Sequence, residues 1–320
     1  MNISDSSALC AHTLAEDMRV NMGRAIVGNH DAIEHILVAL LSRGHVLIED
    51  VPGTGKTTLA KALAASLDCS FGRIQFSPDL VPADVIGVNI YDTKLSSFSF
   101  VPGPVFCQVL LADEINRATP RTQSSLLEAM QEGQVSLDGT TSKLPDPFFV
   151  MATLNPVEME GTFPLPEAQL DRFTLRISLG YPSRDDESQM LERFRSKPNG
   201  VTLEPVAGPA SIAAARTEVD SVLVEQPIRD YLLDIIERTR NHELLRLGSS
   251  PRASLALQKA TQARAMLAGR TFVLPDDVKA LAGPVLAHRL VTDTSARLRG
   301  MTGDSLIAEI LDEVPVPIEI

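Results

Sequence analysis

Hydrophobic and polar positions change their period several times along the first half of the chain. Apolar residues recur at helical spacing in two N-terminal stretches, which predicts helices that end near Gly23 and Gly44. Short apolar runs then alternate with helical stretches at about 56–67 and 122–132. The expected strands are residues 45–49, 73–76, 109–112, 148–153 and 174–179. Strands that alternate with helices predict an α/β fold with a parallel sheet covered on both faces.

Two segments interrupt this alternation. Residues 79–103 contain several Pro and Gly and an alternating piece at 95–101, which predicts a hairpin inserted in a loop. Residues 134–144 place Asp138-Gly139 between two short runs, and Asp-Gly is typical of a two-residue hairpin turn. We therefore expect two hairpins in addition to the sheet.

After Gly180 the pattern becomes helical, with no further long strand. Residues 196–209 contain Pro, Gly and polar residues and are interpreted as a linker. Amphipathic spacing predicts three helices, at about 228–239, 252–267 and 275–286. We place a domain boundary near residues 183–184, which divides the chain into an α/β core (1–183) and a small all-helical domain (184–320).

The first strand leads into a glycine-containing loop and then a helix, the layout of a phosphate-binding P-loop. Gly53 and Gly55 let backbone N–H groups turn toward an anion, and the helix that starts near Lys56 offers its positive end. Lys56 is expected to reach the β- and γ-phosphates, and the Thr57 hydroxyl to ligate Mg²⁺. The generic motif has glycine where this chain has Asp50. The expected nucleotide-binding residues of the loop are Pro52, Gly53, Thr54, Gly55, Lys56, Thr57 and Thr58.

Polar side chains also end two later strands. Asp113 and Glu114 follow an apolar run, and we expect the first to hold Mg²⁺ through water and the second to polarise the attacking water. Asn155 ends another strand, where its amide can orient a water or touch the γ-phosphate. Arg117 follows the carboxylates and either faces a subunit interface or neutralises Glu114 at rest. The purely structural alternatives are that Asp113 and Glu114 cap a following helix and that Asn155-Pro156 starts an ordinary turn.

Two arginines are candidates for contact with a nucleotide. Arg172 lies between a helix and the last strand, an exposed position suited to an arginine finger that reaches a neighbouring subunit's γ-phosphate. Its alternative is a surface arginine paired with Asp171 or Glu167. Arg252 starts a helix of the second domain and is expected to lie over the nucleotide and report its state. Its alternative is an ordinary surface arginine at a helix N-terminus.

Composition, charge and the missing motifs argue against several classes of function. The chain has 320 residues, 44% of them hydrophobic, enough for about two domains with real cores. Its net charge of −12 disfavours broad binding to a nucleic-acid backbone, so no nucleic-acid partner is expected. We expect a cytoplasmic protein without membrane insertion, because neither a signal peptide nor an apolar span is evident. The His residues lack metal-binding spacing, and a Gly-x-Ser-x-Gly nucleophile motif is missing.

Five motifs taken together resemble the MoxR family of AAA+ ATPases. They are residues 50–57, 113–118, 152–156, 165–173 and 250–253. The resemblance covers about residues 20–290, and Asp50 in the P-loop is itself a form associated with this family. Where the family has Arg before Pro-Gly-Pro in the inserted hairpin, this chain has Val101, which puts a role of that hairpin arginine in question.

The resemblance implies how such a chain works. The core would bind ATP and the helical domain would be a lid, with the nucleotide between them and between neighbours in a homo-oligomeric ring, usually a hexamer. Val27 and Gly28 match the segment near adenine. Relatives are similar to chaperone-like motors whose protein partners carry a von Willebrand A domain. We therefore expect an ATPase that needs ATP and Mg²⁺ and remodels or activates a protein partner complex.

Other functions stay open at this point. A magnesium-chelatase-like motor would drive metal insertion into a tetrapyrrole, and the identity of the neighbouring protein would distinguish it. A helicase-type motor acting on DNA needs Lys or Arg near its hairpin tip, where this chain has residues 138–141 with only Lys143 nearby. A nucleotide-binding scaffold without hydrolysis is disfavoured by the intact set Lys56, Asp113, Glu114 and Arg172.

Overall fold

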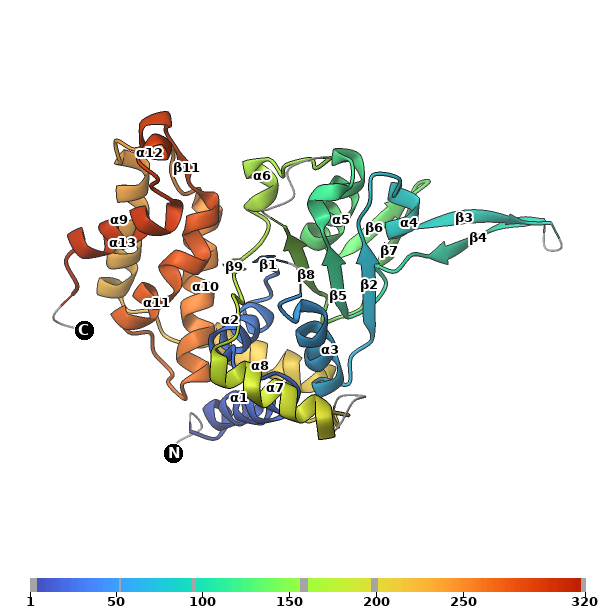
Figure 1. Cartoon of the computed structure of the whole chain (residues 1–320), viewed down its shortest axis with the longest axis horizontal. Coiled ribbons are helices and arrows are strands. Elements are labelled where there is room, and N and C mark those ends of the chain that lie inside the picture. Colours follow the sequence, from blue (N-terminus) through green and yellow to red (C-terminus); the bar gives the residue numbers. More distant parts are fainter. Residues whose placement is uncertain (1–4, 52, 94–95, 156–160, 197–200, 318–320) are drawn as a thin grey trace.

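The centre of the protein is a parallel sheet. The computed structural model describes residues 5–51, 53–93, 96–155, 161–196 and 201–317. Five strands lie in the order β2-β5-β8-β1-β9, as Figure 1 shows. They are β1 (Val46–Glu49), β2 (Phe71–Gln75), β5 (Val109–Asp113), β8 (Phe149–Leu154) and β9 (Leu175–Ile177). The expected parallel α/β sheet is confirmed.

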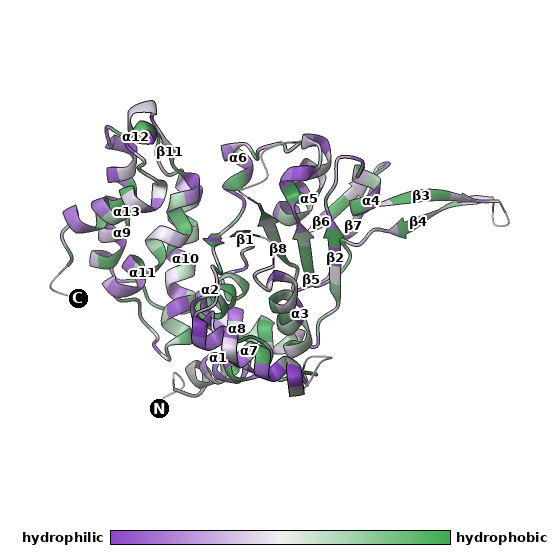
Figure 2. Cartoon of the chain, viewed as in Figure 1, coloured by the Kyte–Doolittle hydropathy of each residue, from purple (hydrophilic) through white to green (hydrophobic). Residues whose placement is uncertain are grey.

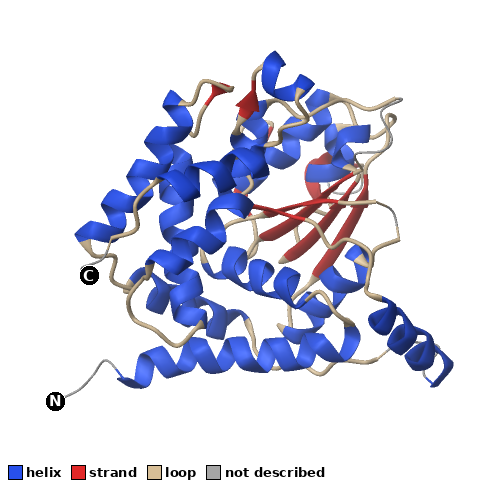
Figure 3. Ribbon diagram, turned by 60° about the vertical axis from the view of Figure 1, so that its left-hand side comes forward, coloured by secondary structure: helices blue, strands red, loops and turns tan. Residues whose placement is uncertain are grey.

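Helices cover both faces of this sheet, which Figure 3 shows in a turned view. Within β5, Val109 and Leu111 belong to one hydrophobic cluster, whereas Leu110 and Ala112 belong to the other. Successive side chains of a strand point to opposite faces, so an apolar run without polar gaps is buried on both sides. In Figure 2, β5 and β8 are drawn largely in the colour of hydrophobic residues. The helices are α1 (Asp5–Ala25), α2 (His30–Leu41) and α3 (Lys56–Ser66) with the first cluster, and α5 (Pro120–Glu132) with the second.

Both expected hairpins are present. After α4 (Pro82–Ile86), β3 (Gly87–Asp92) and β4 (Ser97–Pro102) form an antiparallel arm that projects away from the rest of the molecule (Figure 1). Leu95, at the start of the expected alternating piece, lies outside the described residues. The second hairpin pairs β6 (Gln134–Leu137) with β7 (Thr140–Lys143). Its turn residues Asp138 and Gly139 have φ of 49° and 79°, as a type I′ turn requires.

The region after the sheet is helical, as expected, but not throughout. A short antiparallel pair, β10 (Leu245–Leu247) and β11 (Val291–Thr292), lies among the helices. The helices are α7 (Arg184–Ser196), α8 (Pro209–Asp220), α9 (Gln226–Asn241), α10 (Pro251–Leu267), α11 (Pro275–Leu286), α12 (Thr294–Leu298) and α13 (Gly303–Glu313). Within the described residues, none of the helices is long and apolar enough to cross a membrane.

The contacts of helices α8 and α11 show how the helical region lies against the α/β core. Helix α8 packs against α1 and α2 as well as against α10, so it touches both halves of the chain. The boundary near residues 183–184 therefore stays a prediction. Helix α11 packs against β9, which places the helical region beside the edge strand of the sheet. This edge is where the helical region approaches the predicted site.

Candidate active site

The P-loop connects β1 to α3 at the carboxyl edge of the sheet. Gly53 and Gly55 have φ of 86° and 91°, which L side chains rarely adopt, while an added Cβ at either position would meet open space. The Lys56 ammonium donates to the backbone oxygens of Asp50 and Val51, at 2.9 and 3.0 Å. The lysine therefore lies across its own loop. Pro52, a predicted member of the set, lies outside the described residues.

The end of α3 at this loop fits an anion. Its N-cap is Gly55, which has no side chain to accept from the first N–H groups, and its first turn contains no acidic residue. Free N–H groups and the helix dipole favour a phosphate at such an end. Thr54 and Thr57 are partly exposed and Thr58 is exposed. The loop therefore has the backbone geometry and the charge that the predicted phosphate site needs.

Asp50 explains the departure from the generic P-loop. Its carboxylate accepts hydrogen bonds from three backbone N–H groups, those of Val51 at 2.8 Å, Leu179 at 2.9 Å and Gly180 at 3.0 Å. The side chain is buried, and buried N–H groups need such acceptors. Asp50 thus ties the first residue of the P-loop to the chain that leaves β9.

Replacing Asp50 with glycine would restore the generic motif, yet we expect it to destabilise the protein. The N–H groups of Leu179 and Gly180 would lose their acceptor, and a buried donor without a partner costs about 1–3 kcal/mol. Urea unfolding should show a decrease of that size for Asp50→Gly. The matched control Asp79→Gly removes an exposed carboxylate and should change stability much less. Equal stability of Asp50→Gly and the parent would show that these hydrogen bonds do not hold the loop.

Asp113 is the last residue of β5 and is buried. The Thr153 hydroxyl donates to its Oδ1 at 3.1 Å, and the same hydroxyl oxygen accepts from the Glu114 N–H at 2.8 Å. Arg73, on the neighbouring strand β2, pairs with Asp113 Oδ2 at 2.8 Å. Thr153 therefore links the Asp113 carboxylate to the Glu114 backbone through one oxygen, and Arg73 balances the charge of Asp113.

Glu114 directly follows Asp113 and has a left-handed backbone, with φ of 55°. Its Oε2 accepts from Gln75 Nε2 at 2.8 Å and from Arg117 Nη1 at 2.9 Å. The alternative that Arg117 neutralises Glu114 is thus the arrangement observed. One carboxylate oxygen of Glu114 is therefore engaged by two donors.

Sequence reasoning missed Thr153, Arg73 and Gln75. A signal for the last two was present, because positions i and i+2 of a strand share one face, and both residues lie on exposed positions of β2. The register pairs Gln75 with Asp113, so this face of β2 ends beside the carboxylates. A buried threonine one residue before the end of β8 has no comparable signal.

Other predicted residues lie on separate elements around this edge. Asn155 is buried directly after β8, which pairs with β1 and β5. Val27 and Gly28 lie between α1 and α2. Asp186 of α7 lies directly against Gly28, because an added Cβ there would come within 2.8 Å of Asp186 Oδ2. The expected adenine segment is therefore packed against the helix that follows β9.

Arg172 lies between α6 (Glu167–Leu170) and β9. Its side chain lines an open hollow together with residues of α5 and the start of β6: Ser124, Glu128, Gln131, Glu132 and Gln134. The acids proposed as alternative partners are engaged elsewhere, since Asp171 lies 3.4 Å from Arg289 and Glu167 lies 3.6 Å from Arg246. Arg172 thus faces α5 and the hairpin β6–β7, and not the P-loop.

Arg252 is exposed in the first turn of α10. The N-cap of this helix is Ser250, whose Oγ accepts from the Ala253 N–H at 3.3 Å and donates to Asp171 Oδ2 at 3.1 Å. The turn that carries Arg252 is therefore bonded to the residue next to Arg172. The structure brings the two candidate arginines to one region by this contact.

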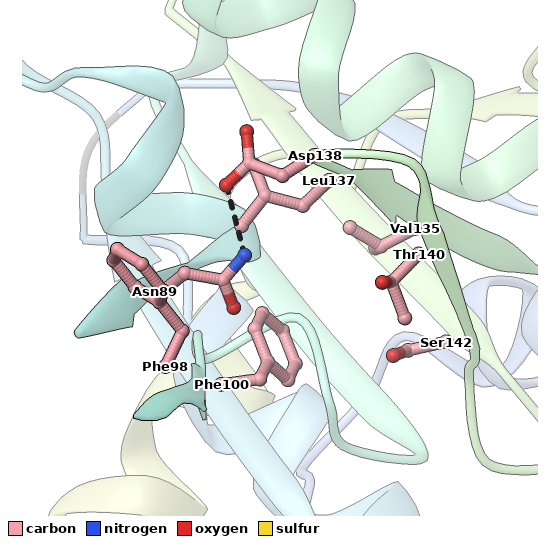
Figure 4. Close-up of a pocket in the computed structure, with 8 residues that line it drawn as sticks. All are labelled: Asn89, Phe98, Phe100, Val135, Leu137, Asp138, Thr140 and Ser142. Atoms are coloured by element: carbon pink, nitrogen blue, oxygen red, sulfur yellow. Dashed lines mark hydrogen bonds between the residues drawn. The ribbon is translucent and has the colours of Figure 1, made fainter. Parts of the chain in front are cut away.

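The two hairpins meet beside the sheet, as the close-up in Figure 4 shows. Asn89 of β3 donates to Asp138 Oδ2 in the turn of β6–β7 at 2.8 Å. The hollow between them has a volume of about 560 Å³ and is lined largely by apolar and hydroxyl side chains: Phe98, Phe100, Val135, Leu137, Thr140 and Ser142. Among the described lining residues, Asp138 is the single charged one. The described residues of this lining include no Lys or Arg that could pair with a nucleic-acid phosphate.

Comparisons with known proteins agree with this geometry. Residues 45–175 match the family described as ATPase family associated with various cellular activities (AAA), and residues 237–310 match an AAA lid domain. The chain is 40% identical to chaperone MoxR1 of Mycobacterium tuberculosis (strain ATCC 25618 / H37Rv), over 96% of this chain and 83% of that protein. It is 47% identical to uncharacterized protein YeaC of Bacillus subtilis (strain 168), over 96% of both. A crystal structure of a protein from Cytophaga hutchinsonii ATCC 33406 superimposes with a TM-score of 0.91, with 35% identity and 98% coverage of both chains.

Proposed function

Because this chain belongs to the MoxR family of AAA ATPases, which are P-loop ATP hydrolases, we propose that it couples Mg²⁺-dependent ATP hydrolysis to the remodelling or activation of a protein partner complex. The working unit would be a homo-oligomeric ring, hexameric by analogy with relatives. Residues 1–183 would be the nucleotide-binding core and 184–320 the lid. Its partner would carry a von Willebrand A domain.

The loop and the carboxylates supply the groups that nucleotide binding needs. The N–H groups around Gly53 and Gly55 and the Lys56 ammonium would hold the phosphates of ATP. Thr57 would ligate Mg²⁺ and Asp113 would hold it through water, and the bound ion would neutralise charge on the phosphates. Among the described residues no group of three or more His, Cys, Asp or Glu could hold a metal ion by itself. Such a pair of ligands fits an ion that arrives with the nucleotide.

Hydrolysis would depend on Glu114 as the general base. Its carboxylate, one oxygen of which accepts from Gln75 and Arg117, would take a proton from the attacking water. Asn155, at the end of the neighbouring strand, would orient that water. Arg252 would contact the nucleotide from the lid, and Arg172 would act in the site of the neighbouring subunit. The position of Arg172 over α5 supports action between subunits, since the residues around it do not belong to the P-loop.

The observation that carries the partner proposal is the arm formed by β3 and β4. It exposes several large apolar side chains, with Ile90 and Tyr91 50% and Phe98 72% exposed. The rings of Tyr91 and Phe98 pack edge to face across the arm, with centroids 5.2 Å apart. A projecting ribbon with exposed aromatic and aliphatic side chains suits contact with protein, and the described strands β3 and β4 contain no Lys or Arg for the phosphates of DNA.

The test is ATP-dependent capture of a partner. Glu114→Gln keeps the shape of the side chain but cannot accept the proton, so we expect ATP binding to persist and turnover to stop. In ATP this variant should retain a von Willebrand A protein from the same organism, measured as stoichiometric co-purification. Capture should be lost with Lys56→Ala and with Phe98→Ser.

Two results would contradict the proposal. One is partner binding that does not respond to ATP. The other is saturable stimulation of the parent ATPase by DNA at physiological salt, which would favour a DNA motor. Near-normal hydrolysis by Glu114→Gln would move the role of the base to another residue.

A further inference from the structure

A buried junction joins the lid to the residues on either side of Arg172. The short 3₁₀ helix η2 (Ala287–Arg289) follows α11. Arg289 Nη2 donates to the backbone oxygen of Phe173 at 2.7 Å, and Arg289 Nη1 lies 3.4 Å from Asp171 Oδ1. One guanidinium therefore donates to the backbone of one sequence neighbour of Arg172 and lies at ion-pair distance from the carboxylate of the other.

Two further groups complete the junction. Ser250 Oγ donates to the other oxygen of Asp171 at 3.1 Å, and His288 Nε2 lies 3.1 Å from the Phe173 oxygen. Burial lowers the pKa of His288 well below its usual value, so its ring is neutral at pH 7. Ser250, His288 and Arg289 all belong to the lid, whereas Asp171 and Phe173 belong to the core. The contacts thus cross between the two parts of the chain.

The charge at this junction is well shielded from water. The Arg289 side chain is 3% exposed and that of Asp171 18%. Burial lowers the pKa of Arg289 to about 10, the Asp171 carboxylate opposes this, and the positive charge of Arg252 adds to it. Arg289 therefore stays charged at neutral pH, and a buried guanidinium can fix its partners through several donors at once. Removing it would leave the segment around Arg172 with weaker restraints.

We propose that Arg289 is a positioning residue for Arg172: it holds the backbone oxygen of Phe173 on one side and faces the Asp171 carboxylate on the other, so that the Arg172 side chain reaches the neighbouring subunit's nucleotide. This inference rests on the proposed function of Arg172. Because Arg289 is part of the lid, the position of Arg172 also depends on the position of the lid. The Arg289 side chain itself would touch neither ATP nor the attacking water.

An intersubunit site has two halves: the P-loop and carboxylates of one subunit, and the arginine of its neighbour. The proposed role predicts which of them Arg289→Met damages. The variant should bind ATP within about twofold of the parent and hydrolyse it on the order of tenfold to a hundredfold more slowly, since small misplacements of a catalytic group have effects of that size. Its own Lys56, Asp113 and Glu114 remain in place. The damaged half would be the arginine that it lends to its neighbour.

Mixed rings separate the two halves. Arg289→Met subunits mixed with Glu114→Gln subunits should recover activity, because Glu114→Gln lends an intact Arg172 to an intact site. Arg289→Met mixed with Arg172→Ala should recover none, because neither variant lends a working arginine. The opposite pattern, recovery with Arg172→Ala and none with Glu114→Gln, would show that Arg289 serves its own subunit's site and would overturn the proposal. Unchanged activity of Arg289→Met alone would also overturn it.

A reference mixture distinguishes this proposal from the function on which it rests. Arg172→Ala mixed with Glu114→Gln must recover activity if Arg172 acts between subunits. Without that recovery, the function of Arg172 fails and the role of Arg289 fails with it. With that recovery, the Arg289→Met mixtures judge Arg289 alone.

Two further variants guard against general damage to the fold. Asp171→Asn removes the charge that faces Arg289 at nearly constant size. Like Arg289→Met, it should recover activity when mixed with Glu114→Gln and recover none when mixed with Arg172→Ala. Arg238→Met is the matched control, because Arg238 is an exposed lid arginine that pairs with Glu313. It should hydrolyse ATP at the parent rate. If Arg289→Met does not form rings, Asp171→Asn decides the assignment.

Discussion

Lys56→Ala is expected to lower the affinity for ATP on the order of a hundredfold, because a charge-assisted contact to a phosphate is worth about 1.5–3 kcal/mol. The structure adds a second reason. The ammonium also bridges the backbone oxygens of Asp50 and Val51, so its loss removes two contacts that shape the loop. Isothermal titration with ATP and Mg²⁺ measures the effect directly.

Lys61→Ala is the matched control for this experiment. Lys61 is on the same helix α3, is exposed and lies outside the loop. It should bind ATP with the parent affinity, so that a loss in Lys56→Ala alone reports on the phosphate site. Unchanged affinity of Lys56→Ala would mean that this loop does not hold the phosphates.

The sequence predicted the parts of the molecule that local patterns determine. The strands of the sheet are short apolar runs with helices between them, so their positions could be read from hydrophobic spacing. The glycines of the P-loop and the turn at Asp138-Gly139 follow from the backbone angles that few residues adopt. The candidate residues at the ends of β1, β5 and β8 meet at one edge because the strands are parallel.

Parts without a local pattern were missed. Helix α7 is largely polar, as Figure 2 shows, and lacks the apolar stripe on which helix prediction depends. Strands β10 and β11 have three and two residues, too few for any period to appear. Helix α8 lies directly after the expected linker and has a weak apolar pattern rich in alanine.

The support of the candidate site was missed for a different reason. Asp50 was recognised as unusual, but its role depends on N–H groups that follow β9, far away in the sequence. Arg289 likewise acts on Asp171 and Phe173 across the junction between lid and core. Such contacts are set by tertiary packing, and neither spacing nor composition reveals them.

Arg172→Ala is expected to bind ATP with the parent affinity and to hydrolyse it at least on the order of a hundredfold more slowly. The transition state would lose a cation aimed at charge that develops on the γ-phosphate. The Lys56, Asp113 and Glu114 of the same subunit remain in place, which explains the retained binding. Steady-state hydrolysis and ATP titration on one preparation separate the two effects.

Arg246→Ala controls for the loss of an arginine in this region. Arg246 is exposed and lies 3.6 Å from Glu167, a geometry worth little to stability. We expect it to hydrolyse ATP at the parent rate. If Arg172→Ala itself turned over ATP at the parent rate under conditions where rings form, Arg117 or Arg252 would become the better candidate.

Neighbouring subunits are proposed to complete one ATP hydrolysis site between them. The hydrolysis rate of mixed Arg172→Ala and Glu114→Gln subunits tests this most directly. Each variant alone should be inactive. In an even random mixture, half of the sites keep Glu114 and half of their neighbours keep Arg172, so about one quarter of the interfaces should be competent if they act independently. Coupling around the ring would lower that value. Recovered hydrolysis is the predicted result, and mixed rings that bind ATP but remain as inactive as either variant alone would contradict it.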